Sequence, residues 1–144
     1  MVAYLDSSLV LRHILLGDPA IHHAFACDRV VTSELLEIEC RRVLQRYRLN
    51  GDLNDEGFVQ AAERLQAVLA GTWILALSPE VKTRAMGAYP VVVKTLDALH
   101  LASAQTFAEQ HLSREPEEQL LIFSYDASLN RCARALELPT PLAG

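Results

Sequence analysis

Two aspartates come just after apolar runs whose composition predicts short strands. Asp6 directly follows residues 2–5, and Asp126 follows residues 120–124, a run that closes with Ser124, after the single residue Tyr125. Each acid is also placed to cap a following helix by accepting a backbone N–H, which is the simplest role for either one alone. If both strands belong to one parallel sheet, both carboxylates emerge at the edge where such sheets build their sites. This pattern indicates the beginning of a cation site.

A third aspartate, Asp97, lies in the first turn of a helix predicted over residues 95–111, which is rich in Ala and Leu. The helix dipole favours an anion at this position. The neighbouring residues Leu96 and Ala98 are apolar, however, so we expect the carboxylate to lie near the core. A buried charge needs a partner or a metal ion, and Asp97 is therefore less ordinary than a surface acid.

A fourth acid is expected from a helix predicted over residues 33–48, which contains Glu34, Glu37 and Glu39. At ~100° per residue, Glu39 borders one side of the apolar stripe of this helix and Glu37 borders the other. Glu34 points away from the stripe and is expected to be solvent-exposed. Helical phase therefore leaves open which of Glu37 and Glu39 enters a site.

Together, these acids suit a hard divalent cation. Mg²⁺ prefers oxygen ligands, keeps several waters, and is typically held by one or two direct carboxylates while others act through water. Four acids would suffice for one or two ions of Mg²⁺ or Mn²⁺. Such an ion can lower the pKa of a bound water and neutralise charge on a phosphodiester, so the pattern predicts metal-assisted hydrolysis.

The elements that position these acids alternate between strand and helix. The expected strands are residues 2–5, 30–31, 73–77 and 120–124. The expected helices are a first one that ends at Gly17, a short one reaching about residue 27, and then residues 33–48, 54–70, 79–87, 95–111 and 126–136. The tail, residues 139–144, would carry a last edge strand or none. This alternation predicts an α/β fold with a parallel sheet and helices on both faces.

Length and composition predict one domain over residues 1–144. The chain is 51% hydrophobic, with six Gly and six Pro, which is typical of a globular protein with an ordinary core. No basic stretch before an apolar run opens the sequence, and no uncharged segment approaches the roughly 18–20 residues of a membrane span. We therefore expect a cytoplasmic protein that does not enter a membrane. Three widely separated cysteines without a C-x-x-C motif are expected to be reduced.

The charge balance argues against a broad basic surface for nucleic acid, because the formal net charge is −5 and the pI is about 5.5. Any contact with RNA would have to be local. Arg41, Arg42, Arg46 and Arg48 place four positive charges within eight residues, although a solvated helix face is the commoner reason for such a run. The candidate RNA-binding residues are Arg41, Arg42 and Arg46.

Four segments carry a resemblance to a known family. They are Tyr-Leu-Asp-Ser-Ser at residues 4–8, Thr-Ser-Glu-Leu-Leu-Glu-Ile-Glu-Cys-Arg-Arg at residues 32–42, Leu-Asp-Ala-Leu-His-Leu-Ala-Ser-Ala at residues 96–104, and Ser-Tyr-Asp-Ala-Ser-Leu at residues 124–129. In this order, the chain resembles PIN-domain ribonucleases of the VapC toxin type over nearly its whole length. The most specific segment is the one around Asp97, followed by the one around Asp6.

The resemblance implies a PIN-like three-layer α/β fold, in which a short central parallel sheet of four to five strands is flanked by helices. It also implies a Mg²⁺- or Mn²⁺-dependent endoribonuclease, usually a homodimer, that a cognate VapB-type antitoxin holds inactive. The residues that match the family's metal pocket are Asp6, Glu39, Asp97 and Asp126, where Glu39 is chosen because it directly precedes Cys40-Arg41-Arg42. A hydroxyl near the first or last acid often assists, which points to Ser8 and Ser124.

By this resemblance, Asp97 and Asp6 would hold the principal metal ion, while Glu39 binds that ion or orients its water. Asp126 would assist a second ion or a water. RNA cut in this way would carry 5′-phosphate and 3′-hydroxyl ends.

Two other classes of protein stay open at this point. A phosphoaspartate receiver or phosphatase also places Asp after its first strand beside Mg²⁺, but the phosphatase motif Asp-x-Asp would need an acid where this chain has Ser8. A non-catalytic PIN-like binding module would use the acids only as helix caps and its apolar surface for a partner.

Overall fold

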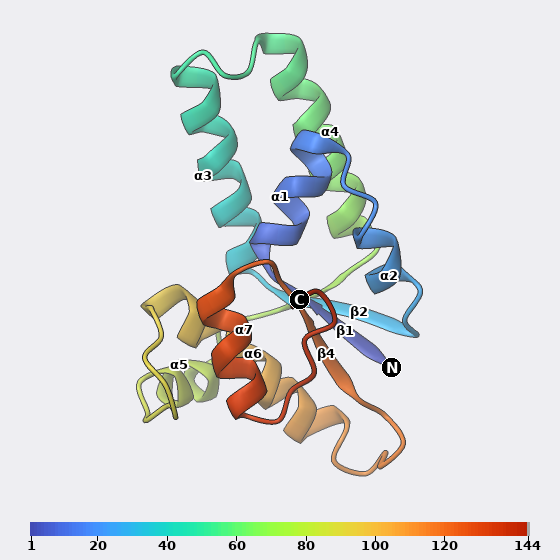
Figure 1. Ribbon diagram of the computed structural model, residues 1–144, viewed down its shortest axis with the longest axis vertical. Coiled ribbons are helices and arrows are strands. Elements are labelled where there is room, and N and C mark those ends of the chain that lie inside the picture. The colour runs from blue at the N-terminus through green and yellow to red at the C-terminus, as the bar shows by residue number, and fades with distance from the viewer. Residues whose placement is uncertain (144) are drawn as a thin grey trace.

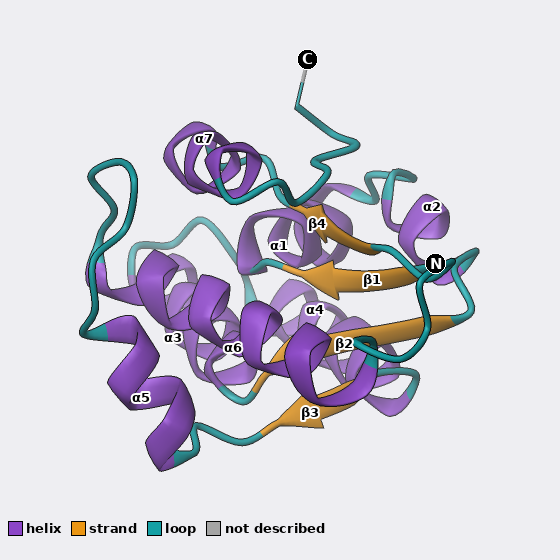
Figure 2. Ribbon diagram, turned by 90° about the horizontal axis from the view of Figure 1, so that it is seen from below, coloured by secondary structure: helices purple, strands orange, loops and turns teal. Residues whose placement is uncertain are grey.

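A four-stranded, all-parallel sheet forms the middle layer of the protein, with helices on both faces (Figure 1, Figure 2). The computed structural model describes residues 1–143, and the predicted three-layer α/β class is confirmed within them. The elements in chain order are β1 (Val2–Leu5), α1 (Ser7–Leu16), α2 (Ile21–Phe25), β2 (Arg29–Ser33), α3 (Leu35–Leu49), α4 (Asp55–Ala70), β3 (Trp73–Leu75), α5 (Pro79–Ala85), α6 (Thr95–His111), β4 (Leu120–Phe123) and α7 (Ala127–Ala135).

The strand order places β1 in the interior of the sheet. The order is β3-β2-β1-β4, so β1 pairs with β2 on one side and with β4 on the other. Leu5, the last residue of β1, pairs with Phe123, the last residue of β4. Because the two strands are parallel and end together, the residues that follow them reach the same edge of the sheet.

Side-chain alternation along β1 divides the core between the two faces of the sheet. Ala3 and Leu5 belong to the cluster formed with α1 to α4, whereas Val2 and Tyr4 belong to the cluster formed with α6 and α7. The backbone at Asp6 is still extended, with φ −93° and ψ 154°. Since side chains alternate with a period of two, Asp6 continues the row of Val2 and Tyr4 and faces α6.

The helices on the two faces have different shapes and surroundings. Helices α3 and α4 form a hairpin that extends beyond the sheet, and α1 packs against both of them (Figure 1). Helix α6 is buried over most of its circumference, including the consecutive residues 100–104. The prediction that this Ala- and Leu-rich helix is central is therefore confirmed.

Helix boundaries follow local signals in most places. Ser78 accepts a hydrogen bond from the backbone N–H of Val81 at 3.2 Å, and Pro79 occupies the first helical position. Gly17 ends α1 with φ 70°, a left-handed conformation that glycine adopts without strain. Helices α2, α3 and α6 are exceptions, because their N-cap residues make no side-chain capping bond.

Most strand bounds lie within one residue of the prediction, and one end differs more. Strand β2 spans Arg29–Ser33, so it begins one residue before the predicted Val30 and ends at the predicted Thr32-Ser33 pair, where it lies beside β3. Strand β3 ends at Leu75 rather than at residue 77, because the chain turns there to meet Glu34. The backbone N–H of Glu34 donates to the carbonyl of Leu75, and the Glu34 carboxylate accepts from the N–H of Leu77, both at 2.9 Å.

The C-terminal tail runs beside β4 without forming a strand over residues 139–143. The N–H of Ile122 in β4 donates a backbone hydrogen bond to the carbonyl of Pro139 in the tail at 2.8 Å. The final residue of the predicted tail, residue 144, lies outside the described residues. In the described part of the chain, the three cysteines are free, and no helix is long and apolar enough to cross a membrane.

Candidate metal centre

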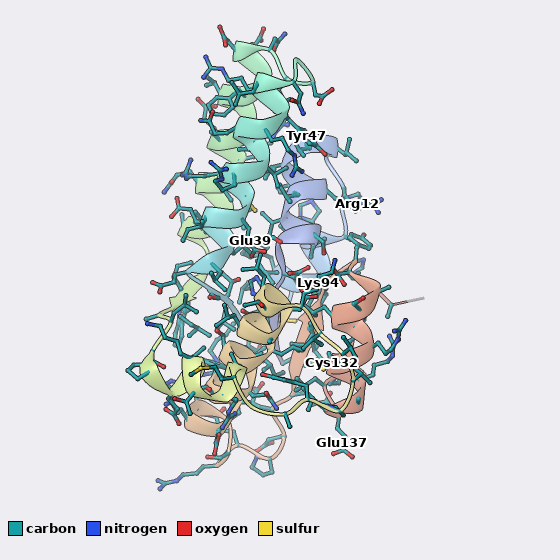
Figure 3. All side chains as sticks on the ribbon, turned by 90° about the vertical axis from the view of Figure 1, so that its left-hand side faces the viewer. Arg12, Glu39, Tyr47, Lys94, Cys132 and Glu137 are labelled. Carbon is teal, nitrogen blue, oxygen red and sulfur yellow. The ribbon has the colours of Figure 1, made fainter. Side chains whose placement is uncertain are left out.

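A cavity of about 430 Å³ opens beyond the carboxyl ends of β1 and β4, and all four predicted acids line it. Asp6 follows β1, Glu39 projects from α3, Asp97 lies in the first turn of α6, and Asp126 precedes α7. The other lining residues are Ser7, Ser8, Lys94, Thr95 and Leu96. Figure 3 shows Glu39 and Lys94 at the junction where α3 meets the start of α6. The fold therefore brings together acids that are up to 120 residues apart in the sequence.

Asp6 is buried, with 4% of its surface exposed, and its Oδ2 atom has several hydrogen-bond partners. The Ser8 hydroxyl donates to this oxygen at 2.7 Å and the Ser124 hydroxyl at 2.8 Å. The backbone N–H of Ser8 also donates to it at 3.3 Å, so Asp6 caps α1. Both predicted supporting serines thus contact the same carboxylate oxygen.

The two serines also fix the turn that carries Asp126. The Ser8 hydroxyl oxygen accepts from the N–H of Tyr125, and the Ser124 hydroxyl oxygen accepts from the N–H of Asp126, each at 2.9 Å. Asp126 itself caps α7, because its Oδ1 atom accepts from the N–H of Leu129 at 2.9 Å. Helix capping and lining the cavity are therefore compatible roles, for Asp126 as for Asp6.

Asp97 has the least favourable surroundings of the four acids. The residue is 9% exposed, and its Oδ2 atom is buried with no hydrogen-bond partner among the described residues. Burial, followed by repulsion from the charges of Asp126 and Asp6, raises the pKa of Asp97 to about 6. The charged carboxylate is thus held in a place that lacks a compensating partner.

The structure separates Glu39 from Glu37. The Oε1 atom of Glu39 lies 2.5 Å from Nε2 of His100, and the side chain is 18% exposed. Glu37 instead lies at the surface, where it pairs with Nε of Arg41 at 2.8 Å. Of the two positions that helical phase left open, only Glu39 lines the cavity.

His100 was missed by the sequence analysis. Its ring is 1% exposed, and its Nε2 atom lies 3.9 Å from Oδ1 of Asp6 as well as beside Glu39. Burial acts to lower the pKa of His100, but the hydrogen bond to Glu39 and the charges of Asp6, Glu39 and Asp97 outweigh it and raise that pKa. The signal was present, because His100 follows Asp97 by three residues and so lies on the same helix face.

A second missed feature holds the Asp126 turn against α1. The guanidinium of Arg12 lies 4.3 Å from the centre of the Tyr125 ring, and the Tyr125 hydroxyl donates to Asp18 at 3.0 Å. Arg12 completes the group with an ion pair to Asp18 at 3.1 Å. No spacing rule would have found this contact, since Tyr125 is more than 100 residues from its partners.

The candidate RNA-binding arginines divide by helix face. Relative to Glu39, Arg42 and Arg46 fall within about 60° around α3, whereas Arg41 falls about 160° away. Arg42 and Arg46 are exposed on the side of the helix that carries Glu39 to the cavity. Arg41 is tied to Glu37 and lies within 3.4 Å of the Gln66 side-chain oxygen on α4.

The donor set suits a divalent cation, although the acids would have to adjust to hold one. Among the described residues, no group of three or more His, Cys, Asp or Glu side chains is arranged to hold a metal ion as it stands. Asp6 accepts two hydroxyls, and Glu39 is turned toward His100. The buried, unpartnered oxygen of Asp97 nevertheless fits a cation, and Mg²⁺ tolerates indirect ligands because it keeps several waters.

Comparison with known proteins agrees with the architecture. The fold is similar to a chain of VapBC2 from Rickettsia felis, a complex crystallised bound to a DNA fragment from their promoter, with a TM-score of 0.66, 12% identity and coverage of 97% of each chain. It is also similar to PAE2754 from Pyrobaculum aerophilum, with a TM-score of 0.57, 18% identity and coverage of 91% of this chain and 78% of that one. No curated protein matches by sequence. The PIN domain model matches residues 3–135, a span that contains all four acids, and the chain therefore belongs to the PIN domain family.

Proposed function

We propose that residues 1–144 form a single PIN domain that acts in the cytoplasm as a Mg²⁺- or Mn²⁺-dependent endoribonuclease, the toxin of a toxin–antitoxin pair. PIN domains are generally nucleases, and the chain's membership of that family supports hydrolysis of a nucleic-acid backbone. The observation that carries the proposal is the buried oxygen of Asp97, which has no hydrogen-bond partner among residues 1–143 and lies in a cavity lined by three further acids. A buried carboxylate without a hydrogen-bond partner is stabilised when a cation binds to it.

In this proposal, Asp97 and Asp6 hold the principal ion, Glu39 binds it or orients its water, and Asp126 assists through its second oxygen. When bound, a divalent ion supplies Lewis-acid stabilisation of phosphodiester charge and lowers the pKa of a water. Ser8 and Ser124 keep Asp6 in one orientation through their hydroxyls. The family match also leaves the phosphoaspartate alternative without support.

The RNA strand is proposed to cross the mouth of the cavity along α3. Lys94 is exposed beside the acids and can place an ammonium group against a backbone phosphate. Arg42 and Arg46 continue the positive charge along the same side of α3 as Glu39. This local track reconciles RNA binding with the overall net charge of −5.

The toxin role adds two protein partners to the proposal. The similar complex from Rickettsia felis is a VapBC pair, and by analogy a VapB-type antitoxin would bind this chain and reach an arginine into the acidic cavity. We also propose a homodimer. The exposed apolar side chains of Met86 and Val92 support it, because they line a second, apolar cavity of about 710 Å³ near the start of α6.

The test of the nuclease is RNA cleavage by the purified chain, with Asp97→Asn and Glu37→Gln purified in the same way. Wild type and Glu37→Gln should cut RNA only when Mg²⁺ or Mn²⁺ is added, and Asp97→Asn should be inactive. Glu37→Gln is the matched control, because it also removes an acid from α3 but one that lies at the surface. Equal activity in wild type and Asp97→Asn would indicate a contaminating nuclease. No metal-dependent cleavage in wild type would leave a binding module as the better account.

The dimer is tested separately by light scattering. The expected result is a mass of twice the 16.0 kDa chain, and a shift to the monomer in Val92→Lys. A monomer at high wild-type concentration would contradict the homodimer without affecting the nuclease proposal.

A further inference from the structure

A buried chain of hydrogen bonds connects the interior of the protein to one acid of the cavity. The Tyr4 hydroxyl oxygen lies 2.7 Å from Nδ1 of His100, and Nε2 of the same ring lies 2.5 Å from Oε1 of Glu39. Tyr4 and His100 are each 1% exposed. The three side chains come from β1, α6 and α3, so the contact joins three elements that are distant in the sequence.

The hydrogen bonds of this chain can be satisfied whichever protonation state the His100 ring has. The Tyr4 hydroxyl can either donate to Nδ1 of His100 or accept from it, because a tyrosine hydroxyl does both. In either case Nε2 can carry the proton that is donated to the Glu39 carboxylate. Each buried polar atom in the chain thereby has a partner, as buried polar atoms in proteins generally do.

The same imidazole N–H lies between two acids that would otherwise repel each other. Nε2 of His100 is 2.5 Å from Glu39 and 3.9 Å from Oδ1 of Asp6. Tyr4 is also two residues before Asp6 on the same row of β1 and packs edge-on to the His100 ring, with centroids 5.7 Å apart. The pair of buried rings is therefore built against the acidic cavity rather than simply placed in the core.

We propose that Tyr4 and His100 are positioning residues for Glu39, which hold its Oε1 atom and direct its other carboxylate oxygen to the metal centre. The inference rests on the proposed function, because it assumes that Glu39 serves a divalent ion. A glutamate side chain has three rotatable bonds, and fixing it beforehand removes an entropic cost from ion binding. Glu37 shows the contrast, since it lies on the same helix and pairs only with a surface arginine.

The first test removes the hydroxyl of Tyr4 and leaves its ring. Mn²⁺ binding is measured by titration calorimetry for wild type, Tyr4→Phe and Tyr89→Phe. Tyr89→Phe is the matched control, because the Tyr89 hydroxyl also bonds to α6, donating to the carbonyl of Ala98 at 3.2 Å, but does not contact Glu39. Tyr4→Phe should bind Mn²⁺ about 10-fold more weakly, as expected when a partner of a metal ligand is lost, and Tyr89→Phe should bind like wild type.

A double-mutant cycle tests whether Tyr4 acts through Glu39. In a Glu39→Gln background, adding Tyr4→Phe should cause no further loss of Mn²⁺ affinity. His100→Gln and His100→Leu provide a second comparison at the ring, because Gln keeps an N–H donor for Glu39 whereas Leu suits an apolar interior better. If His100 positions Glu39, His100→Gln should bind Mn²⁺ more tightly than His100→Leu does. If His100 has only a structural role, His100→Leu should equal or exceed His100→Gln in both Tm and Mn²⁺ affinity.

These outcomes separate the positioning role from the nuclease function. If wild type cuts RNA and Tyr4→Phe binds Mn²⁺ as tightly as wild type, the positioning role is overturned and the nuclease stands. If wild type binds Mn²⁺ and Tyr4→Phe binds it about 10-fold more weakly but neither cuts RNA, the positioning role stands and the nuclease is overturned. A wild-type chain that binds no Mn²⁺ would overturn both.

Discussion

The two sides of the acidic cavity solve the problem of burying a carboxylate differently. On the side of β1 and β4, the buried oxygen of Asp6 accepts three hydrogen bonds, and Asp126 caps a helix. On the side of α6, the buried Oδ2 atom of Asp97 has no partner among the described residues, and the pKa of that carboxyl is raised to about 6. One side is fully hydrogen-bonded as folded, while the other leaves a buried oxygen to which the proposed cation would bind.

Under the proposed function, this difference marks where the protein gives up stability for metal binding. A folded-state pKa of about 6, against a usual value of 3.8, means that the charged Asp97 opposes folding at neutral pH. The hydroxyls around Asp6 have the opposite effect, because hydrogen bonds to a charged group stabilise it. Substitutions on the two sides should therefore change the free energy of unfolding in opposite directions while both reduce activity.

The largest expected effect is on catalysis by Asp97→Asn. Loss of several kcal/mol of charge stabilisation corresponds to a fall in kcat on the order of 10³-fold. The same variant should unfold at a higher temperature than wild type, and Asp6→Asn, also inactive, should unfold at a lower one. Cleavage assays measure the activity of the two variants, and thermal melts measure their stability. A lower Tm for Asp97→Asn than for Asp6→Asn would contradict the difference between the two sides of the cavity.

The next largest effect is on the pH dependence of stability. Because the pKa of Asp97 is raised in the folded state, its penalty is absent below about pH 4, grows as the pH rises, and is fully present above about pH 6. Two pKa units correspond to at most about 3 kcal/mol, reduced by whatever solvent reaches the side chain. In urea melts without metal, the free energy of unfolding of Asp97→Asn should rise relative to that of wild type by about 1–3 kcal/mol between pH 4 and pH 7. A gap that does not change with pH would contradict the assigned burial of the charge.

A smaller effect on activity than that of Asp97→Asn is expected from the hydroxyls that support Asp6. Ser124→Ala removes a buried donor to Asp6 and the acceptor for the N–H of Asp126, which should cost about 1–3 kcal/mol of stability. Activity should fall about 10-fold, as for other partners of metal ligands. Ser113→Ala, at an exposed serine, should change neither quantity. Equal Tm values for the two variants would show that the Asp6 side is not held in the way described.

The smallest effect is expected at the arginines of α3. Arg42→Gln and Arg46→Gln should each weaken RNA binding a few-fold and reduce the slope of log K against log salt concentration by about 1. Arg41→Gln should alter binding less, because Arg41 pairs with Glu37 on another face of the helix. Filter binding at several salt concentrations measures these slopes, and a larger change for Arg41→Gln would place the RNA on that other face.

Much of the fold was predictable because its signals are local. Residues such as Asp6, Ser78 with Pro79, and Gly17 mark helix ends through their own backbone and side-chain chemistry. Strand ends were harder, because they depend on partners elsewhere in the chain. The end of β3, for example, is set by Glu34, which accepts from the N–H of Leu77 across 43 residues of sequence.

The sequence predicted which acids would line the cavity but not what surrounds them. The sequence could place Asp6 and Asp126 at the ends of strands, and the family resemblance chose Glu39 over Glu37. It could not indicate that Asp97 lacks a partner, since that depends on how α6 packs against the turn of Asp126. His100 was recognisable only by its spacing from Asp97.

Calorimetric titration of Mn²⁺ into wild type, Asp97→Asn and Glu37→Gln at pH 7.5 tests the central claim most directly. The acidic cavity is predicted to bind the ion in wild type and in Glu37→Gln with equal affinity. Asp97→Asn is predicted to bind it at least about 100-fold more weakly, because the unpartnered carboxylate is the group that calls for a cation. Equal Mn²⁺ affinity in wild type and Asp97→Asn would contradict the account.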